Sequence, residues 1–454
     1  MRFLTANSAG RYFCCIRMGY SRVCRLPWLA MLVAAGWSCG SGSGLSTQQP
    51  NVILIMADDL GYETLRANGG TSYQTPNLDA LADAGMRFTE AYATPLCTPS
   101  RVQLMTGVYN FRNYIGFGLL DPSERTFAHH FQNAGYRTAI VGKWQLYGNA
   151  RQRELAGGRI GSLPEQAGFD EYALWQVESL GSRYKHPRLN VTDQPTQDYA
   201  DAYGPDMFAD YIGDFLERHR DQRFLLYYPM VLPHAPFQPT PSHPDYADFT
   251  GAGVNDTTYF KDAVAHMDDV VGRITNDLER LGLRENTLVL FVGDNGTDRR
   301  VTSAMGDRVV RGLKGYTTEA GTHVPLIANW PGTVAPGQVN DNLVDFTDFL
   351  PTLLETARLE TPSDLVTDGL SFYRQLTGQA DTVRRWIFCH YAPSWGNLPH
   401  RRFVHDREWK LYGDGTLYHI ATDPEELHPV ADEVLLANVL ELKQGFQDVL
   451  DRMR

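Results

Sequence analysis

Short apolar runs alternate along the chain with longer segments in which apolar residues recur every three or four positions. A continuous apolar run bounded by polar residues is typical of a strand buried on both faces of a parallel sheet. Such runs predict strands at 51–57, 86–93, 136–141, 224–232, 287–292 and 324–330. Helical periodicity predicts helices from residue 75 to 84 and over 127–133, 205–218, 259–281 and 347–357. Alternating strands and helices indicate an α/β protein with a mainly parallel sheet.

The pattern changes in two places. Residues 145–200 are polar and irregular, which predicts an insertion over the surface. Beyond about residue 380 the apolar runs become short, at 386–390, 402–404, 409–412 and 417–419, and a helical pattern follows over 434–453. We therefore predict a main domain over 50–379 and a small C-terminal sheet-plus-helix subdomain over 380–454.

Residues 1–49 differ in composition from the remainder, with five arginines, no acidic residue and a 12-residue apolar run at 26–37. That run is too short to span a bilayer but fits the apolar part of a secretory signal. We predict an export leader and tether over 1–49, a periplasmic or secreted protein, and no transmembrane span in the mature chain. Cys39, followed by a Gly-Ser tract, raises the alternative of a lipid-anchored protein, although Gly36 stands where a lipoprotein signal has an aliphatic residue.

Charge and cysteine content narrow the function further. The formal net charge is −12, and residues 50–454 carry 36 basic and 53 acidic side chains. This excess of acidic residues argues against a broad surface that binds nucleic acid. Any anionic ligand therefore requires a local binding site. Outside the leader only Cys97 and Cys389 remain, too few and too distant for a disulfide scaffold. Cys389 lies in an apolar run that fits a core, whereas Cys97 lies in a polar, proline-rich stretch.

The stretch Cys97-Thr98-Pro99-Ser100-Arg101 stands between a predicted strand and a helix-like segment. Pro99 suits the first turn of a helix, where a missing N–H is no loss. Free backbone N–H groups at a helix start attract anions, and Arg101 adds a fork of donors that fits sulfate or phosphate. Taken alone, an ordinary cysteine before a helix explains the same residues.

Other polar residues also follow predicted strands. They are Asp58 and Asp59, Lys143, His234 (in Pro233-His234-Ala235-Pro236), Asp294 and Asn295. Each has an ordinary explanation, such as a turn, a helix cap or a solvated lysine. Because sites in α/β sheets lie outside the carboxyl ends of the strands, one shared site explains them together. Two adjacent carboxylates there also repel each other unless a cation lies between them.

These stretches resemble type I sulfatases of the alkaline-phosphatase-like superfamily. The matching pieces are 51–59, 97–101 with Gly107, 142–144, 233–234, 294–296 and 314–325, in family order, and 409–424 resembles the family's C-terminal domain. The resemblance implies an α/β fold with a large mainly parallel sheet sandwiched by helices and a small C-terminal antiparallel-sheet domain. It also implies hydrolysis of sulfate esters, here of a sulfated small molecule or, given the predicted export, of a carbohydrate.

The resemblance further implies roles for individual residues. Cys97 would be oxidised to formylglycine by a maturation enzyme, and its hydrate would supply the nucleophile. Asp58, Asp59, Asp294 and Asn295, with the modified Cys97, would bind Ca²⁺, a hard cation. Arg101, Lys143 and Lys314 would bind the sulfate, and His234 with Lys314 would protonate the leaving oxygen.

One position departs from the family pattern. The stretch Gly142-Lys143-Trp144 continues with Gln145, where the family usually has a histidine that helps to deprotonate the diol when sulfate is eliminated. Glutamine can hydrogen-bond the diol and the substrate but is no base near neutral pH. Gln145 therefore raises the alternative of a degenerate, calcium-dependent binder of sulfated glycans. A second alternative, a phosphodiester or phosphonate monoester hydrolase of the same superfamily, stays open because such relatives share the formylglycine and the metal acids.

The organic part of the substrate cannot be inferred from these motifs. Candidate contacts lie in the 145–200 segment and in the C-terminal segment, with ordinary surface or packing roles as the alternative for each. They are Arg183, Tyr184, His186, His390, Tyr391, Trp395 and His400.

Overall fold

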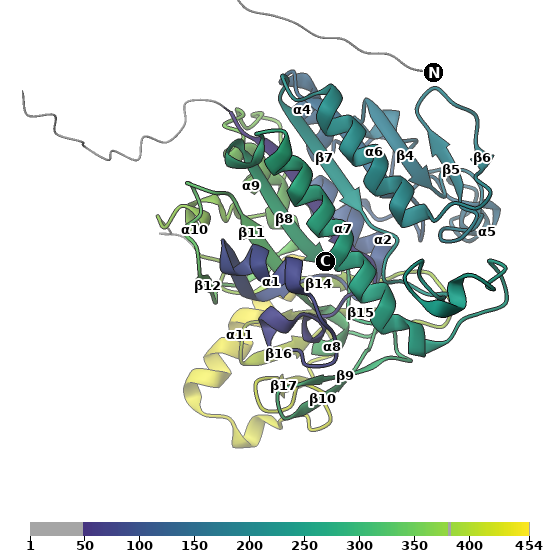
Figure 1. The fold of residues 1–454 in the computed structure, drawn as a ribbon. Coiled ribbons are helices and arrows are strands. Elements are labelled where there is room, and N and C mark those ends of the chain that lie inside the picture. The colour runs from purple at the N-terminus through teal and green to yellow at the C-terminus, as the bar shows by residue number, and fades with distance from the viewer. Residues whose placement is uncertain (1–48, 380–382, 454) are drawn as a thin grey trace, which may run out of the picture. The chain divides into compact units, whose positions relative to one another are not determined.

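An eleven-stranded sheet forms the centre of the computed structural model, which describes residues 49–379 and 383–453 (Figure 1). The strand order is β12-β2-β11-β8-β1-β7-β3-β4-β5-β6, and β13 also pairs with β2. Its central strands are β1 (Asn51–Ala57), β7 (Phe224–Pro229), β3 (Arg137–Lys143) and β8 (Thr287–Gly293), all parallel. The remaining strands are β2 (Met86–Tyr92), β4 (Glu171–Trp175), β5 (Arg188–Val191), β6 (Gln197–Asp198), β11 (His323–Asn329), β12 (Gln338–Asn340) and β13 (Val344–Asp345). The predicted mainly parallel α/β architecture is confirmed.

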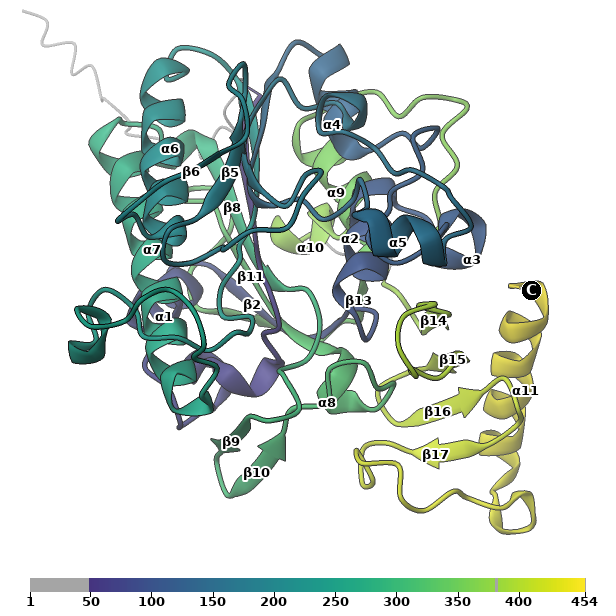
Figure 2. The same cartoon turned by 90° about the vertical axis from the view of Figure 1, so that its right-hand side faces the viewer.

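Helices cover both faces of this sheet (Figure 2). On β1, Val52, Leu54 and Met56 pack on one face, and Ile53 and Ile55 on the other, because successive side chains of a strand point to opposite sides. The first face is covered by α2 (Cys97–Thr106), α4 (Phe127–Asn133) and α9 (Phe349–Thr356). The second is covered by α1 (Pro76–Asp83), α6 (Gly204–Arg218) and α7 (Phe260–Arg280). With both faces covered, β1 is buried throughout and reads as one apolar run.

The prediction that residues 145–200 form an irregular insertion over the surface was wrong, because part of this segment belongs to the central sheet. It contains α5 (Ala150–Leu155) and three strands of the central sheet, of which β4 is parallel to β3 and β5 and β6 are antiparallel. The strand β4 begins at Glu171, whose carboxylate is paired by Arg137 and Arg218 from neighbouring elements. The segment therefore extends the sheet and places the residues after Trp175 beside the end of β3.

A second, antiparallel sheet follows near the C-terminus. It consists of β14 (Ile387–Tyr391), β15 (Arg401–His405), β16 (Trp409–Tyr412) and β17 (Leu417–His419). The helix α11 (Ala437–Arg452) packs Phe446 and Leu450 against Phe388 and Val404 of this sheet. The predicted small antiparallel sheet is thus confirmed, while its boundary at 380 stays a prediction.

The predicted leader over 1–49 lies, except for Gln49, outside the described residues. Export and lipid attachment through Cys39 therefore stay predictions. Within residues 49–379 and 383–453, no helix combines the length and apolar character that crossing a membrane requires.

Candidate active site

The helix α2 positions Cys97 at its first residue, and all ten of its residues are buried. Side chains on the helix hold it in place, since Ser100 donates to the carbonyl oxygen of Thr94 at 3.0 Å and Gln103 donates to Asp345 at 2.7 Å. Gly107 ends the helix with φ of 70°, a conformation that favours glycine, and a Cβ there would lie 3.0 Å from Leu350. The chain is therefore tied at both ends of the helix that carries the thiol.

Three carboxylates from two strand ends form one cluster with Cys97 and His234. Asp58 and Asp59 follow β1, and Asp294 follows β8, its parallel neighbour. Ligand atoms of Asp58, Cys97 and Asp294 all lie within 4.8 Å of one another, as do those of Asp58, Asp59 and His234. The backbone N–H of Asp59 donates to Asp294 Oδ1 at 2.9 Å. Asp59 has φ of 65°, in the left-handed region, which is energetically costly for residues other than glycine. These contacts hold the second carboxylate toward the others.

Each of the three carboxylates is paired with its own cation. Lys143 Nζ lies 2.9 Å from both oxygens of Asp58. Lys314 Nζ lies 2.6 Å from Asp59 Oδ1, and Arg101 Nη2 lies 2.9 Å from Asp294 Oδ2. The structure thus brings together the predicted nucleophile, acids and cations.

Burial and neighbouring charges move the pKa values of these acids apart. Burial and the negative charge of Asp58 raise the pKa of Asp294 to about 7. Burial also raises the pKa of Asp59, against the opposing pull of Lys314. For Asp58, burial is outweighed by Lys143, His234 and Arg101, which hold its pKa well below the usual value. Asp59 and Asp294, whose pKa values are raised, are the carboxyls whose ionised form a bound cation would stabilise.

The residues present fit a hard cation. Asn295 Nδ2 donates to Asp59 Oδ1 at 2.9 Å, but Asn295 Oδ1 is buried and has no hydrogen-bond partner among the residues that the structure describes. A buried carbonyl oxygen without a donor is costly, and ordinarily has a partner. Three carboxylates and one amide oxygen form an all-oxygen set of the kind that Ca²⁺ prefers.

The end of β3 brings Gln145 to the thiol. At Gly142, where φ is 114°, a Cβ would lie 2.2 Å from the carbonyl oxygen of Pro229, so only glycine fits between β3 and β7. Gln145 itself has φ of 49°, and its Oε1 lies 3.9 Å from Cys97 Sγ. The departure from the expected histidine therefore lies directly beside the predicted nucleophile.

The site has a closed floor and a more open rim. Side chains of Arg101, Lys143 and Asp58 are at most 2% exposed, whereas Lys314 and His234 are 16% and 21% exposed. His234 Nε2 lies 3.6 Å from Asp59 Oδ2. Burial, together with Lys314, holds the pKa of His234 well below its usual value. A ligand would reach the floor past His234 and Lys314.

Comparison with known proteins connects this geometry to a family. The family model described as Sulfatase matches residues 50–359, more than half of the chain. A model described as the C-terminal part of N-sulphoglucosamine sulphohydrolase matches residues 314–452. N-acetylgalactosamine-6-sulfatase of Mus musculus is 33% identical over 426 residues, which cover 81% of this chain and 75% of that protein. The chain belongs to the sulfatase family. It is therefore a sulfuric ester hydrolase, as predicted.

Solved structures share the fold of this sulfatase. One, in complex with D-glucosamine-2-N,6-O-disulfate, has a TM-score of 0.73 at 21% identity and covers 89% of this chain and 98% of its own. Phosphonate monoester hydrolase of Agrobacterium radiobacter has a TM-score of 0.66 at 22% identity, with 89% and 95% covered. At these identities the likeness shows the fold alone, and it confirms the alkaline-phosphatase-like architecture.

One of the predicted substrate contacts reaches the sulfatase site. Arg183 Nη1 lies 3.1 Å from His234 Nδ1 and 3.8 Å from Asp58 Oδ2, and its guanidinium lies 3.8 Å from the ring centroid of Trp175. Tyr184 donates to the carbonyl oxygen of Val231 at 2.8 Å and so ties this segment to the His234 loop. Trp175 was not predicted as a site residue, because its strand β4 was missed.

The other candidate contacts have structural roles. Tyr391 packs in one cluster with Cys97 and donates to the carbonyl oxygen of Gly315 at 3.1 Å, while Trp395 stacks on Phe117 with centroids 4.4 Å apart. His186 Nδ1 accepts from the backbone of Asp201 at 2.9 Å. His390 and His400 line a hollow at the end of the C-terminal sheet, not the Cys97 site.

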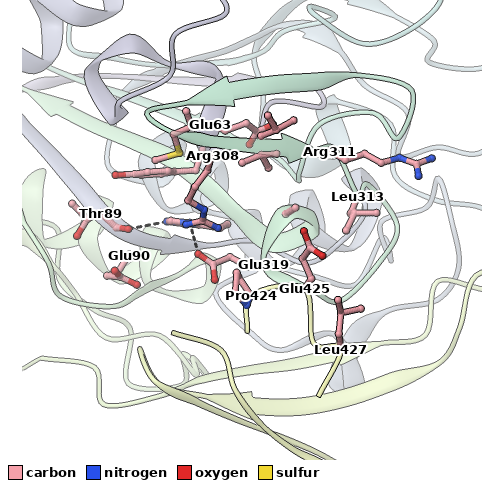
Figure 3. A pocket seen from close by; sticks show the side chains of 16 residues that line it. Glu63, Thr89, Glu90, Arg308, Arg311, Leu313, Glu319, Pro424, Glu425 and Leu427 are labelled. Atoms are coloured by element: carbon pink, nitrogen blue, oxygen red, sulfur yellow. Dashed lines mark hydrogen bonds and ion pairs between the residues drawn. The ribbon is translucent and has the colours of Figure 1, made fainter. Parts of the chain in front are cut away.

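Figure 3 shows a separate cavity of about 470 Å³, lined in part by Leu313. It is bounded by the hairpin of β9 (Thr302–Met305) and β10 (Arg308–Arg311), by α8 (Glu319–Thr322) and by the segment around Pro424. Acidic side chains predominate among its charged groups, including Glu63, Glu90, Glu319 and Glu425. None of the predicted site residues lines it, and this acidic cavity is unsuited to a sulfated ligand.

Proposed function

We propose that this sulfatase hydrolyses sulfate esters of a sulfated carbohydrate, with Ca²⁺ as cofactor and formylglycine derived from Cys97. The observation that carries the proposal is the position of Cys97, at the start of α2, within ligand distance of Asp58 and Asp294. Arg101 and Lys143 lie on the same closed floor. A thiol, a carboxylate cluster and buried cations together serve sulfate transfer better than they serve a structural core.

Two groups would supply chemistry that the chain itself lacks. Ca²⁺, held by Asp58, Asp59, Asp294 and Asn295, would act as a Lewis acid toward sulfate oxygens. The formylglycine hydrate at position 97 would supply a nucleophilic hydroxyl and a second hydroxyl for release of sulfate. The unpartnered Asn295 Oδ1 supports the first assignment.

The chain's own residues bind the sulfate and handle the proton. Arg101 and Lys143, both buried, would hold sulfate oxygens on the floor, where low dielectric strengthens each charge interaction. In the tautomer with the proton on Nε2, His234 Nδ1 accepts from Arg183 Nη1 at 3.1 Å and Nε2–H lies toward Asp59 Oδ2, at 3.6 Å. In the other tautomer, Nδ1–H donates to the carbonyl oxygen of Ala235 instead. His234 Nε2–H, with Lys314 beside it at the rim, would donate to the leaving oxygen and deliver the proton there.

Support for a carbohydrate comes from the relatives. The relative described above is named for N-acetylgalactosamine 6-sulfate, and the solved structure holds a disulfated glucosamine. The predicted export leader points the same way, because sulfated polysaccharides are found outside the cytoplasm. The maturation enzyme that converts Cys97 would be a transient partner.

A direct comparison of substrates tests the proposal. One preparation, made together with a formylglycine-generating enzyme and loaded with Ca²⁺, is assayed on 4-nitrophenyl sulfate and on an aryl phosphonate monoester. We expect the higher kcat/KM on the sulfate. A higher value on the phosphonate would favour the phosphonate monoester hydrolase alternative. Binding of sulfated glycans without any release of sulfate would instead support the degenerate binder.

A further inference from the structure

Arg183 contributes a surplus positive charge to the site. Asp58, Asp59 and Asp294 each have a cation within 2.9 Å, namely Lys143, Lys314 and Arg101. Arg183 is a fourth cation, and its nearest carboxylate oxygen, on Asp58, lies 3.8 Å away, beyond hydrogen-bond distance. Its charge is therefore not consumed by the carboxylates of the site.

The guanidinium of Arg183 is held in place, but not all of its hydrogen-bond donors are used. It stacks on the indole of Trp175 at 3.8 Å, and Nη1 lies 3.1 Å from His234 Nδ1. Within the described residues, Nε and Nη2 of Arg183 make no hydrogen bond. Two donors of a fixed planar fork thus remain for a ligand, an arrangement that suits two oxygens of one anionic group.

The position of Arg183 indicates which part of the substrate it meets. Its side chain is 14% exposed, a fraction similar to those of Lys314 and His234 at the rim. Arg101 and Lys143 on the floor are at most 2% exposed. The sulfate must reach Cys97 on the floor, so the group attached through the ester oxygen lies at the rim. Arg183, beside His234, consequently faces this organic part and not the sulfur.

We propose that Arg183 is a specificity-determining residue that binds a second anionic group, a carboxylate or a further sulfate, next to the scissile sulfate ester. The inference rests on the proposed function and narrows its substrate class to carbohydrates with at least two neighbouring anionic groups. Trp175 is a positioning residue for Arg183, because its ring fixes the plane of the guanidinium.

Matched aryl sulfates test this inference. The substrates are 4-nitrophenyl sulfate and its analogues with a carboxylate or a sulfonate on the ring carbon next to the ester. For Arg183→Gln we expect a loss of kcat/KM on the charged analogues about tenfold larger than the loss on 4-nitrophenyl sulfate, mainly through KM. Arg183→Lys should recover part of that difference, and the two analogues show which anion is preferred.

The control is Arg188→Gln, in the same segment, where Arg188 is paired with Asp198 at the surface. This variant should match the wild-type protein on every substrate. Equal losses of kcat/KM for Arg183→Gln on 4-nitrophenyl sulfate and on the charged analogues would overturn the inference. They would mean that Arg183 acts by positioning His234 or by binding the scissile sulfate itself. A wild-type protein that hydrolyses 4-nitrophenyl sulfate but rejects both charged analogues would also overturn it. Inactivity of the wild-type protein on all three would overturn the proposed function, and the inference with it.

Discussion

The side chain of Gln145 meets the thiol of Cys97, with Oε1 3.9 Å from Sγ. Gln145 also adopts φ of 49°, a conformation in which histidine is more easily accommodated than most residues. The place where a family histidine is expected is therefore adjacent to the predicted nucleophile and has a backbone conformation that histidine can adopt.

Gln145→His should raise the rate of sulfate release or leave it unchanged, because imidazole can accept a proton near neutral pH and glutamine cannot. The measurement is single-turnover and steady-state kinetics on 4-nitrophenyl sulfate, which separate cleavage of the ester from release of sulfate. A large loss of rate would mean that the glutamine has a specific role of its own.

Cys97→Ala should abolish hydrolysis, since the predicted nucleophile is derived from this side chain. Mass spectrometry of the tryptic peptide spanning residues 88–101 from wild-type protein, made beside the maturation enzyme, should show formylglycine in place of cysteine. Cys389→Ala removes the other described thiol, which is buried in the C-terminal sheet, and serves as the control. Unmodified Cys97 in active protein would contradict the prediction.

Asn295→Leu should weaken Ca²⁺ binding about tenfold or more, because one oxygen leaves the ligand set while side-chain volume is nearly kept. Isothermal titration of metal-free protein with Ca²⁺ gives the affinity without reference to turnover. Asp298→Asn is the matched control, since Asp298 is a nearby acid that pairs with Arg300 and is not among the proposed ligands. Equal Ca²⁺ affinities of the Asn295 variant and the wild-type protein would remove Asn295 from the metal site.

Much of this arrangement could be predicted from the sequence, because chemistry and hydrophobicity coincide at strand ends. The runs that form β1 and β8 end next to Asp58 and Asp294, and a shared sheet edge brings these ends together. The strand β4 was missed because it spans five residues and begins with a charged one, Glu171. The pairing of that charge with Arg137 and Arg218 exists only in the folded chain.

The contact of Arg183 with His234 could not be predicted for a related reason. It depends on Trp175, whose position at the end of β4 follows from the sheet and not from local pattern. The sequence singles out Arg183 only as one of several polar residues in a long segment, and tertiary stacking separates it from the others.

Glu171 should make the fold sensitive to acid. Its pKa is lowered from 4.5 to about 2, because hydrogen bonds from Arg218, Arg137 and His219 outweigh burial. A carboxyl with a depressed folded-state pKa stabilises the protein above pH 4.5, and this contribution is lost as the pH falls from there toward 2.

Glu171→Gln should therefore lower the free energy of unfolding by roughly 1–2 kcal/mol at pH 7, allowing for screening of the half-exposed arginines, and by less at pH 3. Urea unfolding at the two pH values measures both differences. Glu178→Gln is the control, because Glu178 is exposed and has no ion-pair partner among the described residues. A deficit that is equal at pH 7 and pH 3 would show that the ion pairs are not its source.

The burial of α2 sets an order of events in the life of the chain. Cys97 is 1% exposed, and every other residue of its helix is buried beneath the sheet and the loops that follow. An enzyme that oxidises this thiol cannot reach it in the finished fold. Under the proposed function, conversion of Cys97 precedes closure of the core, so maturation competes with folding of the chain.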